Sequence, residues 1–295
     1  MKERHNSATL LAILAAALYA ISSPVSKILL NKVSPTMMAG LLYLGAGIGM
    51  SIIGIYRKKT GNTKNEMKIT KKELPYTVGM VVLDILAPIF LMIGLNMTTP
   101  ANVSLLNNFE IVATSLIALF IFKEVIRKRL WIAIGLITIA SIVLSIEDAS
   151  SFSFSLGSIF VLLASVCWGF ENNCTRMLSV KDPLQVVIIK GFGSGFGSLL
   201  ISFILKETST DVFYIISTLL LGFVAYGLSI YFYVYAQREL GAAKTSAYYA
   251  IAPFIGVVLS FIIFFDIPTI SFIVALLIMI VGTYFASTDS KQKDY

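Results

Sequence analysis

The sequence predicts an all-α integral membrane protein with ten transmembrane helices, arranged as two five-helix repeats of opposite topology. Three observations lead to this expectation. Apolar residues make up 57% of the 295 residues and charged residues only 13%, and a water-soluble globule cannot cover so much apolar surface with so few charges. The apolar residues form ten runs that are long enough to cross a bilayer. A spacing of proline and glycine recurs in the second half of the chain.

A bilayer core about 30 Å thick needs about 20 apolar residues per helix. We expect spans at Ser7–Leu30, Pro35–Tyr56, Glu73–Leu95, Ala101–Phe122, Leu130–Ile146, Ser155–Leu178, Pro183–Leu205, Val212–Ala236, Ala242–Phe265 and Pro268–Ser287. The connections are short, and the longest, Arg57–Lys72, is basic. We expect the first run to be a permanent span, because it is too long for a signal peptide and lacks a small-residue cleavage site.

The positively charged residues indicate how the spans are oriented. Of the 23 Lys and Arg residues, 19 share one side of the membrane if the N-terminus is cytoplasmic. Only Lys27, Lys32 and Lys206 fall on the other side, and Lys190 lies within a span. Because positive charge accumulates in cytoplasmic loops, we expect both termini in the cytoplasm and the protein in the plasma or inner membrane. Charges confined to short gaps between apolar runs also argue against nucleic acid as a partner.

The two halves of the chain share a pattern of proline and glycine. Pro35, Gly45, Gly47 and Gly49 recur 148 residues later as Pro183, Gly193, Gly195 and Gly197. Weaker similarities link residues 18–27 to 167–176 and residues 98–110 to 240–253. Each half has five predicted spans, and because five is odd the second half must cross the membrane in the opposite direction. We therefore expect inverted repeats at 1–148 and 149–295, an architecture typical of transporters with a substrate site near the midplane.

This arrangement resembles the EamA-like family of the drug/metabolite transporter superfamily. The resemblance covers nearly the whole chain and rests on the inverted repeat, on Trp168-Gly169 early in the second half and on Pro253 late in it. It implies that the protein moves small metabolites, often amino acids, across the plasma or inner membrane without ATP, with export favoured. It also implies a basic residue early in the second span of each half. Lys190 matches this position, and Tyr43 occupies the approximate first-half equivalent.

Four ionisable residues lie within the predicted spans: Asp84, Glu110, Glu171 and Lys190. Such a residue at the centre of a helix costs about 2.5–3.5 kcal/mol on insertion scales, so each needs a partner or a hydrated cavity. Glu110 belongs to a polar stripe that cannot face lipid. The stripe, on one continuous helix, comprises Ser104, Asn107, Asn108, Glu110, Thr114 and Ser115. Glu110 is expected either to bind a substrate amine or a proton, or only to hold helices together.

The other three ionisable residues each allow two interpretations. Glu171 precedes two asparagines, and it either contributes to the site or pairs with Arg176 on the same helix. Asp84 precedes Pro88, which interrupts backbone hydrogen bonding, and it either relays protons or bonds to the interrupted turn. Lys190 is either the countercharge of a carboxylate or extends to the inner membrane surface.

Tyrosines on the eighth and ninth spans offer hydroxyls to a cavity, although packing and interfacial roles are common for this residue type. Glycines at GxxxG spacing are expected to bring helices close together. The candidate substrate-binding or coupling residues are Glu110, Glu171, Asp84, Lys190, Asn107, Asn108, Asn172, Tyr248, Tyr249, Tyr226 and Trp168.

The expected function is alternating-access transport of a small polar or zwitterionic metabolite, with a proton as the candidate coupling ion. Helices 1, 3, 4, 6, 8 and 9 are expected to line the cavity, with helices 5 and 10 at the periphery. Two other classes stay open. A receptor or assembly subunit would need a binding surface, and the loops are short. An intramembrane enzyme would need a catalytic constellation, and the sole histidine, His5, lies outside the spans. We expect a solute and membrane lipid as partners, no metal and no cofactor; the oligomeric state is open.

Overall fold

The structure is a computed structural model that describes residues 2–59, 67–121, 123, 125–148, 153–178, 181–240, 245 and 248–289. Side chains are described for these residues except 2–6, 147–148, 153, 237–239 and 289. Two predicted span ends, Phe122 and Ala242, lie outside the described residues, as do four of the 19 basic residues assigned to the cytoplasmic side: Lys64, Lys244, Lys291 and Lys293.

The elements follow in chain order. They are α1 (Lys2–Ala20), α2 (Ser22–Leu29), α3 (Pro35–Lys59), the 3₁₀ turn η1 (Lys71–Glu73), α4 (Leu74–Met97), α5 (Pro100–Leu106), α6 (Phe109–Phe120), α7 (Lys128–Ser145), β1 (Ile146–Asp148), β2 (Ser153–Phe154), α8 (Leu156–Leu178), α9 (Pro183–Ile204), α10 (Val212–Gly222), the π-helical segment η2 (Phe223–Leu228), α11 (Ser229–Leu240), α13 (Ala252–Phe264) and α14 (Ile270–Asp289).

Eight helical stretches of the described chain are long and apolar enough to cross a membrane. Two of the ten predicted spans are not among them. Helix α8 is 23 residues long but carries Glu171 and two asparagines, and α13 has only 13 residues. Large apolar side chains are exposed on the outside, as a lipid-facing surface requires; Phe203 is 75% exposed and Ile262 is 60% exposed. The protein is therefore a multi-pass helical membrane protein, and the count of ten spans stays a prediction.

Helices begin where capping residues and prolines favour a start. Asp182 Oδ1 accepts a hydrogen bond from the backbone N–H of Leu184 at 3.0 Å, and Pro183 is the first residue of α9. Thr99 caps α5 in the same way, directly before Pro100. Proline suits the first helical position because its missing N–H would have no partner there, while the cap satisfies another of the free N–H groups.

Three of the predicted spans are interrupted, which corrects the expectation of continuous helices; the ninth contains a turn at 250–251, before α13. The first divides into α1 and α2 at Ile21. The fourth divides into α5 and α6 at Asn107 and Asn108, where the N–H of Asn108 bonds to the carbonyl of Leu105 and that of Glu110 to the carbonyl of Asn107. The amide of Asn108 also donates to the Leu105 carbonyl at 3.2 Å. Asparagine side chains compete in this way with regular helical bonding, which explains the break.

Two further irregularities were not predicted. The eighth span contains the π-helical segment η2, and such segments often occur at functional sites. Strands β1 and β2 form a short antiparallel hairpin, with Ile146 opposite Phe154. The alternation of serine and phenylalanine at 151–154 is the period-two pattern of a strand, so the sequence did contain this signal.

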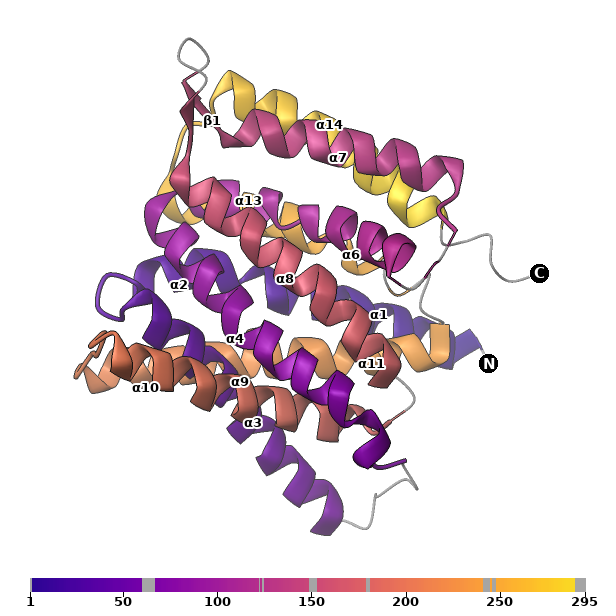
Figure 1. Cartoon of the computed structure of the whole chain (residues 1–295), viewed down its shortest axis with the longest axis vertical. Helices are drawn as coiled ribbons and strands as arrows, with labels where there is room; N and C mark the ends of the chain where they lie inside the picture. Colours follow the sequence, from indigo (N-terminus) through magenta and orange to yellow (C-terminus); the bar gives the residue numbers. More distant parts are fainter. Residues whose placement is uncertain are drawn as a thin grey trace.

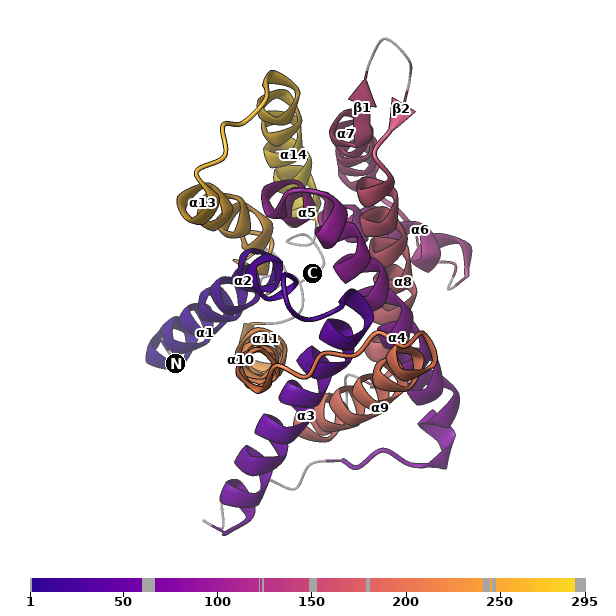
Figure 2. The ribbon, with the colours of Figure 1, turned by 90° about the vertical axis from the view of Figure 1, so that its left-hand side faces the viewer.

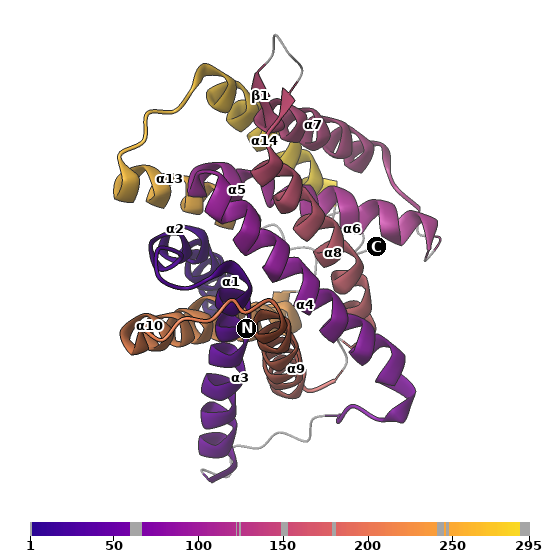
Figure 3. The same cartoon turned by 60° about the vertical axis from the view of Figure 1, so that its left-hand side comes forward.

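The helices pack in distinct pairs. Helices α7 and α14 lie along each other at one end of the molecule (Figure 1), with the β1–β2 hairpin on the same side (Figure 2). Helix α8 lies between α4 and α6 (Figure 3). Helix α1 packs against α11, and α3 packs against both α9 and the α10–η2 stretch. These pairings put α3, α4, α8 and α9 around the buried polar residues.

Helices α3 and α9 run antiparallel and cross at close range. A Cβ atom added to Gly40 would lie 3.0 Å from the backbone of Leu199, whereas one added to Gly54 would contact Leu184. At the crossing, a Cβ on Gly191 would lie 2.4 Å from the backbone nitrogen of Gly47. Only glycine fits at such a distance, in line with the predicted role of the GxxxG glycines.

Candidate functional site

A buried ion network lies where α3, α4, α8 and α9 meet. Lys190 Nζ is 3.1 Å from Asp84 Oδ2 and 2.9 Å from Glu171 Oε1. The hydroxyl of Tyr43 donates to Asp84 Oδ1 at 2.9 Å. Relative exposures of 0% for Asp84, 2% for Glu171 and 7% for Lys190 show that all three charged groups are removed from the surface. We call Asp84, Glu171, Lys190 and Tyr43 the charge network.

Small residues next to the network bring its helices together. Lys190 directly precedes Gly191, which touches α3 through the close approach of the two backbones. A Cβ on Gly193 of α9 would lie 2.9 Å from a side chain of α4, and a Cβ on Gly79 of α4 would lie 3.1 Å from Cys174 Sγ on α8. Because α4 lies close to both α9 and α8, a lysine on α9 reaches carboxylates on both α4 and α8.

Glu110 lies beside the charge network. Its Oε1 accepts a hydrogen bond from Asn172 Nδ2 at 2.5 Å, and the same amide lies 3.2 Å from Thr114 Oγ1. Asn172 is the chain neighbour of Glu171, and Glu110 interacts electrostatically with both Glu171 and Lys190. Two carboxylates therefore pair with the buried lysine, and the third, that of Glu110, lies nearby with an asparagine as its partner. If all were ionised, the region would hold surplus negative charge.

The consecutive polar residues of α8 point to different neighbours. Glu171 binds Lys190 and accepts a hydrogen bond from the hydroxyl of Thr175. Asn173 donates to the carbonyl of Thr114 at 3.2 Å and to that of Gly169 at 2.8 Å. Glu171 thus belongs to the charge network, whereas the two asparagines link α8 to α6.

A row of tyrosine rings extends from the charge network. Tyr43 lies 5.3 Å from Tyr226, measured between ring centroids, and Tyr226 lies 5.9 Å from Tyr19. Tyr19 lies 5.9 Å from Tyr249, which in turn lies 4.9 Å from Tyr233. The rings come from α3, η2, α1, the segment before α13, and α11. The rings together form an apolar surface that also carries hydroxyl groups, and such a surface suits an amphipathic solute.

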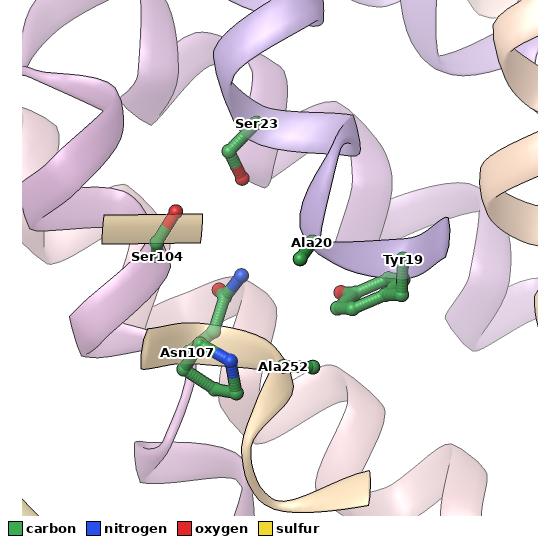
Figure 4. A pocket seen from close by; sticks show the side chains of 7 residues that line it. Tyr19, Ala20, Ser23, Ser104, Asn107 and Ala252 are labelled. Atoms are coloured by element: carbon green, nitrogen blue, oxygen red, sulfur yellow. The ribbon is translucent and has the colours of Figure 1, made fainter. Parts of the chain in front are cut away.

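A small pocket lies where three interrupted helices meet (Figure 4). Its lining comes from the α1–α2 bend, the end of α5 and the start of α13: Tyr19, Ala20, Ser23, Ser104, Asn107, Ala252 and Pro253. It has room for about one water molecule. Asn107 is 8% exposed, and within the described part of the chain its Oδ1 has no hydrogen-bond donor.

The structure brings together Asp84, Glu171, Lys190, Glu110 and Asn172. Of the two interpretations of Lys190, extension to the membrane surface is wrong, because the lysine lies inside the protein as the countercharge of two carboxylates. The side chain of Asp84 meets that lysine and Tyr43 instead of the turn broken by its proline.

The other candidate residues lie around this group. Trp168 is 6% exposed and contacts Tyr43. Tyr226 and Tyr249 belong to the tyrosine row, and Asn107 lines the pocket. Asn108 is bound to the backbone of α5 and to Thr283.

Tyr248 lies apart from the charge network, against an apolar cluster. The cluster comprises Ala8, Ala12, Ala236 and Leu240. The polar stripe of the fourth span is not one surface either, because the break at Asn107 and Asn108 turns its two halves relative to each other, and Ser115 bonds to its own helix.

Sequence reasoning missed Tyr19 and the role of Tyr43. The signal for Tyr43 was its position in the sequence as the approximate first-half equivalent of Lys190. In the structure both side chains bind Asp84. The signal for Tyr19 was the weak similarity of residues 18–27 to 167–176, which pairs Tyr19 with Trp168. Within the described residues, His, Cys, Asp and Glu form no group of three that would hold a metal ion.

Comparison with known proteins gives consistent results. The sequence pattern of the EamA-like transporter family matches residues 6–146 and again residues 155–288. An uncharacterized transporter of Methanothermobacter thermautotrophicus is 25% identical over 288 residues, which cover 92% of this chain and 83% of that protein. The uncharacterized transporter YyaM of Bacillus subtilis is 26% identical over 267 residues, with 87% and 86% covered. A crystal structure of 18% identity covers 98% of both chains with a TM-score of 0.67, so the fold is shared.

Proposed function

This chain belongs to the EamA-like transporter family of the drug/metabolite transporter superfamily, and we propose that it is a secondary active transporter. It moves a small polar or zwitterionic metabolite, such as an amino acid, by alternating access, with export as the direction. The proposed orientation has both termini in the cytoplasm and the protein in the plasma or inner membrane, supported by the asymmetry of Lys and Arg.

The buried charge network is the observation that carries the proposal. Ionisable side chains within membrane spans are costly and mark substrate or proton pathways. Here Lys190, Asp84 and Glu171 lie on three different helices, with Glu110 on a fourth. If these charged residues only packed the helices together, apolar side chains of the same volume would stabilise the protein equally well. The network therefore supports a site that binds charged groups.

The surplus of carboxylates supports the proposed substrate class. Asp84 and Glu171 pair with one lysine, and Glu110 lies beside them with no ion-pair partner of its own among the described residues, so a cationic group or a proton stabilises the region when it enters. We assign the amino group of the solute to Glu110, with Asn172 beside it, and the coupling proton to the carboxylates of the charge network. The tyrosine row supplies an apolar wall for the rest of the solute.

The packing supports the inverted repeat at 1–148 and 149–295. In such a repeat, a contact between two spans recurs between their counterparts five spans along. The contact of α4 with α8 is matched by that of α11 with α1, and the contact of α6 with α8 by that of α13 with α1. The pairs α3–α9, α7–α14 and α5–α13 are their own counterparts. Antiparallel α3 and α9 are what opposed topology requires.

Matching details at the residue level add to this support. Gly169 of α8 contacts Ala113 of α6, and in the counterpart contact Gly256 of α13 lies near the carbonyl of Ala20 on α1. The positions of glycine and alanine are therefore reversed between the two contacts. The break after α5 also has a counterpart, the turn at 250–251 before α13. Two halves that pack alike can exchange conformations, and a site between them then opens to each side in turn.

The proposal is tested by flux through purified protein in liposomes. Twenty radiolabelled amino acids are preloaded one at a time, and their efflux is compared with that from protein-free liposomes. The Glu110→Gln variant should lower the rate at least tenfold for every solute that moves, because it removes the anion. Asp266→Asn, an exposed acid-to-amide change, is the matched control and should keep wild-type rates.

Two results would contradict the proposal. Absence of flux for all twenty amino acids would overturn amino acids as the substrate. Wild-type rates in Glu110→Gln, for every solute that moves, would remove Glu110 from the mechanism.

A further inference from the structure

The pocket of Figure 4 lies where three helices are interrupted. Helix α1 ends at Ala20, α5 ends at Leu106, and a turn at 250–251 precedes α13. Helix interruptions inside a membrane are tolerated where the backbone lines a site or is buried in protein. In transporters, the ends of such broken helices point at polar groups of the solute. The chemistry of the lining therefore indicates which group enters this pocket.

The amide of Asn107 offers its nitrogen to the pocket. The side chain is buried, with the residue 8% exposed, and its Oδ1 is enclosed with no donor among the described residues. Figure 4 shows Nδ2 directed into the pocket, and no group of the described chain accepts a hydrogen bond from it. A buried N–H group without an acceptor is unfavourable. This nitrogen is therefore expected to donate to an oxygen that is not part of the chain.

Three hydroxyl groups surround the same space. They belong to Tyr19, Ser23 and Ser104, and none of them has a hydrogen-bond partner within the described residues. By contrast, the buried Ser165 and Ser260 donate to carbonyl oxygens of their own helices, a common bond for serine in a helix. The hydroxyls at the pocket are thus free to donate to a ligand.

The charges around the pocket favour a negatively charged oxygen. None of the lining side chains carries a charge. Ser23 is the second residue of α2 and Ala252 the first of α13, and helix N-termini carry partial positive charge. The ends of α1 and α5 carry the opposite sign, so the dipoles offset one another and the side chains decide. Those side chains supply donors from one amide and three hydroxyls.

The size of the pocket limits what enters it. The pocket has room for about one water molecule, and it is only partly enclosed. A single carboxylate oxygen takes up about the space of a water molecule. One such oxygen therefore fits inside while the rest of its molecule stays outside.

Glu110 determines which kind of carboxylate is accepted. Its N–H bonds to the carbonyl of Asn107 at 3.1 Å, so the pocket lies one helical turn away, and Tyr19 of the lining interacts electrostatically with this acid. A free anion in the pocket would be repelled by the Glu110 carboxylate. In an α-amino acid, the ammonium group and the carboxylate are attached to the same carbon atom. The ammonium group then neutralises Glu110 while the carboxylate occupies the pocket.

From this geometry we infer that the pocket binds the carboxylate of a transported α-amino acid, with Asn107 Nδ2 as a donor and the hydroxyls of Ser23 and Ser104 beside it. This assignment, which rests on the proposed function with Glu110 at the amino group, gives the same solute a second anchor. It defines the solute as a zwitterion with adjacent charges, as opposed to an amine or a carboxylic acid alone. Because the donors lie on α2 and α5, binding joins two of the interrupted helices.

The test measures binding by the thermal stability of the purified protein in detergent, followed by tryptophan fluorescence. Each of the twenty amino acids is compared with its amide, which keeps the amino group and the side chain but lacks the carboxylate. A ligand that binds only the folded state raises the apparent Tm. The amino acids that bind should raise it, and their amides should do so only at concentrations about tenfold higher or not at all. Acetate, a carboxylate without an ammonium group, should leave the Tm unchanged.

Two variants with matched controls locate the site. Asn107→Asp places an anion where the donor was and should abolish the response to amino acids, whereas a site for a cation would bind more tightly after this change. Asn31→Asp makes the same substitution at an exposed position and should respond like the wild type. Ser104→Ala should weaken the apparent affinity about tenfold. Ser141→Ala should leave it unchanged, because that buried serine lies on α7, away from the pocket.

Equal Tm responses to amino acids and to their amides would overturn the inference and leave amino-acid transport intact. A wild-type response in Asn107→Asp or Ser104→Ala would also overturn it. A rise in Tm with acetate alone would show a site for free anions and contradict the assignment to a zwitterion. If no amino acid changes the Tm, the carboxylate site is excluded, while flux through liposomes decides separately on the transport function.

Discussion

Replacement of Lys190 by methionine removes the cation of the charge network and leaves its two carboxylates. Lys190 is 7% exposed and lies within 3.1 Å of Asp84 and 2.9 Å of Glu171. Methionine retains most of the volume of the side chain, so the change is mainly one of charge. We expect Lys190→Met to destabilise the protein strongly, because two buried carboxylates then lose their partner.

The magnitude follows from the burial of all three groups. Removing one partner from a buried ion pair costs about 3–5 kcal/mol, since the remaining charge is left uncompensated. For a chain of this size, about 1 kcal/mol corresponds to about 2 °C in Tm. The apparent Tm of Lys190→Met should therefore fall by roughly 6–10 °C.

Two further variants separate the loss of charge from a general effect of the substitution. The triple variant Lys190→Met, Asp84→Asn, Glu171→Gln carries no charge in the network and should recover at least half of the lost stability. Lys58→Met makes the same substitution at an exposed position near the end of α3 and should change Tm by about 1 °C or less. Thermal unfolding of all variants in the same detergent gives the comparison. If Lys190→Met unfolds at the same temperature as Lys58→Met, the argument from buried ion pairing is wrong.

Three other predictions follow from the packing and the hydrogen bonds. Gly191→Ala should reduce the yield of folded protein on size-exclusion chromatography, because its Cβ would lie 2.4 Å from a backbone nitrogen of α3; Gly135→Ala, with no atom within 4 Å, should raise stability by up to about 1 kcal/mol. Lys27→Met should destabilise the protein by about 1.5–3 kcal/mol in thermal unfolding, because Lys27 Nζ donates to three carbonyl oxygens at the end of α4; an unchanged Tm would exclude this role. Asn172→Leu should slow amino-acid efflux as strongly as Glu110→Gln does, since it removes the hydrogen-bond donor of that carboxylate; a wild-type rate would show that the bond is dispensable.

Some of the candidate site was accessible from the sequence. An acid or a lysine within an apolar run is visible without coordinates, and the cost of burying it makes a partner necessary. This reasoning identified Asp84, Glu110, Glu171 and Lys190 as residues that need partners. It left two interpretations for Lys190, because a lysine seven residues into a helix can reach either the membrane surface or the protein interior.

The helix interruptions were harder to predict. Helical periodicity predicts one continuous helix with a single polar stripe over residues 101–122. In the structure, the asparagine side chains at 107 and 108 compete for backbone groups, and α5 ends there. The outcome of that competition depends on neighbouring helices. For the same reason, the unpaired oxygen of Asn107 and its pocket have no signature in the sequence.

Composition and the order of residues along the chain were sufficient for the class of protein, the approximate spans and the family, because hydropathy and repeat spacing depend on residues close to one another in the chain. The choice of partner for each buried polar group required the folded chain. Lys190 lies more than 100 residues from Asp84, and their contact exists because α9 packs closely against α4, where Gly193 and Gly197 leave room for side chains of α4. Ion pairing and hydrogen bonding act over a few ångströms, so they depend on packing between distant segments.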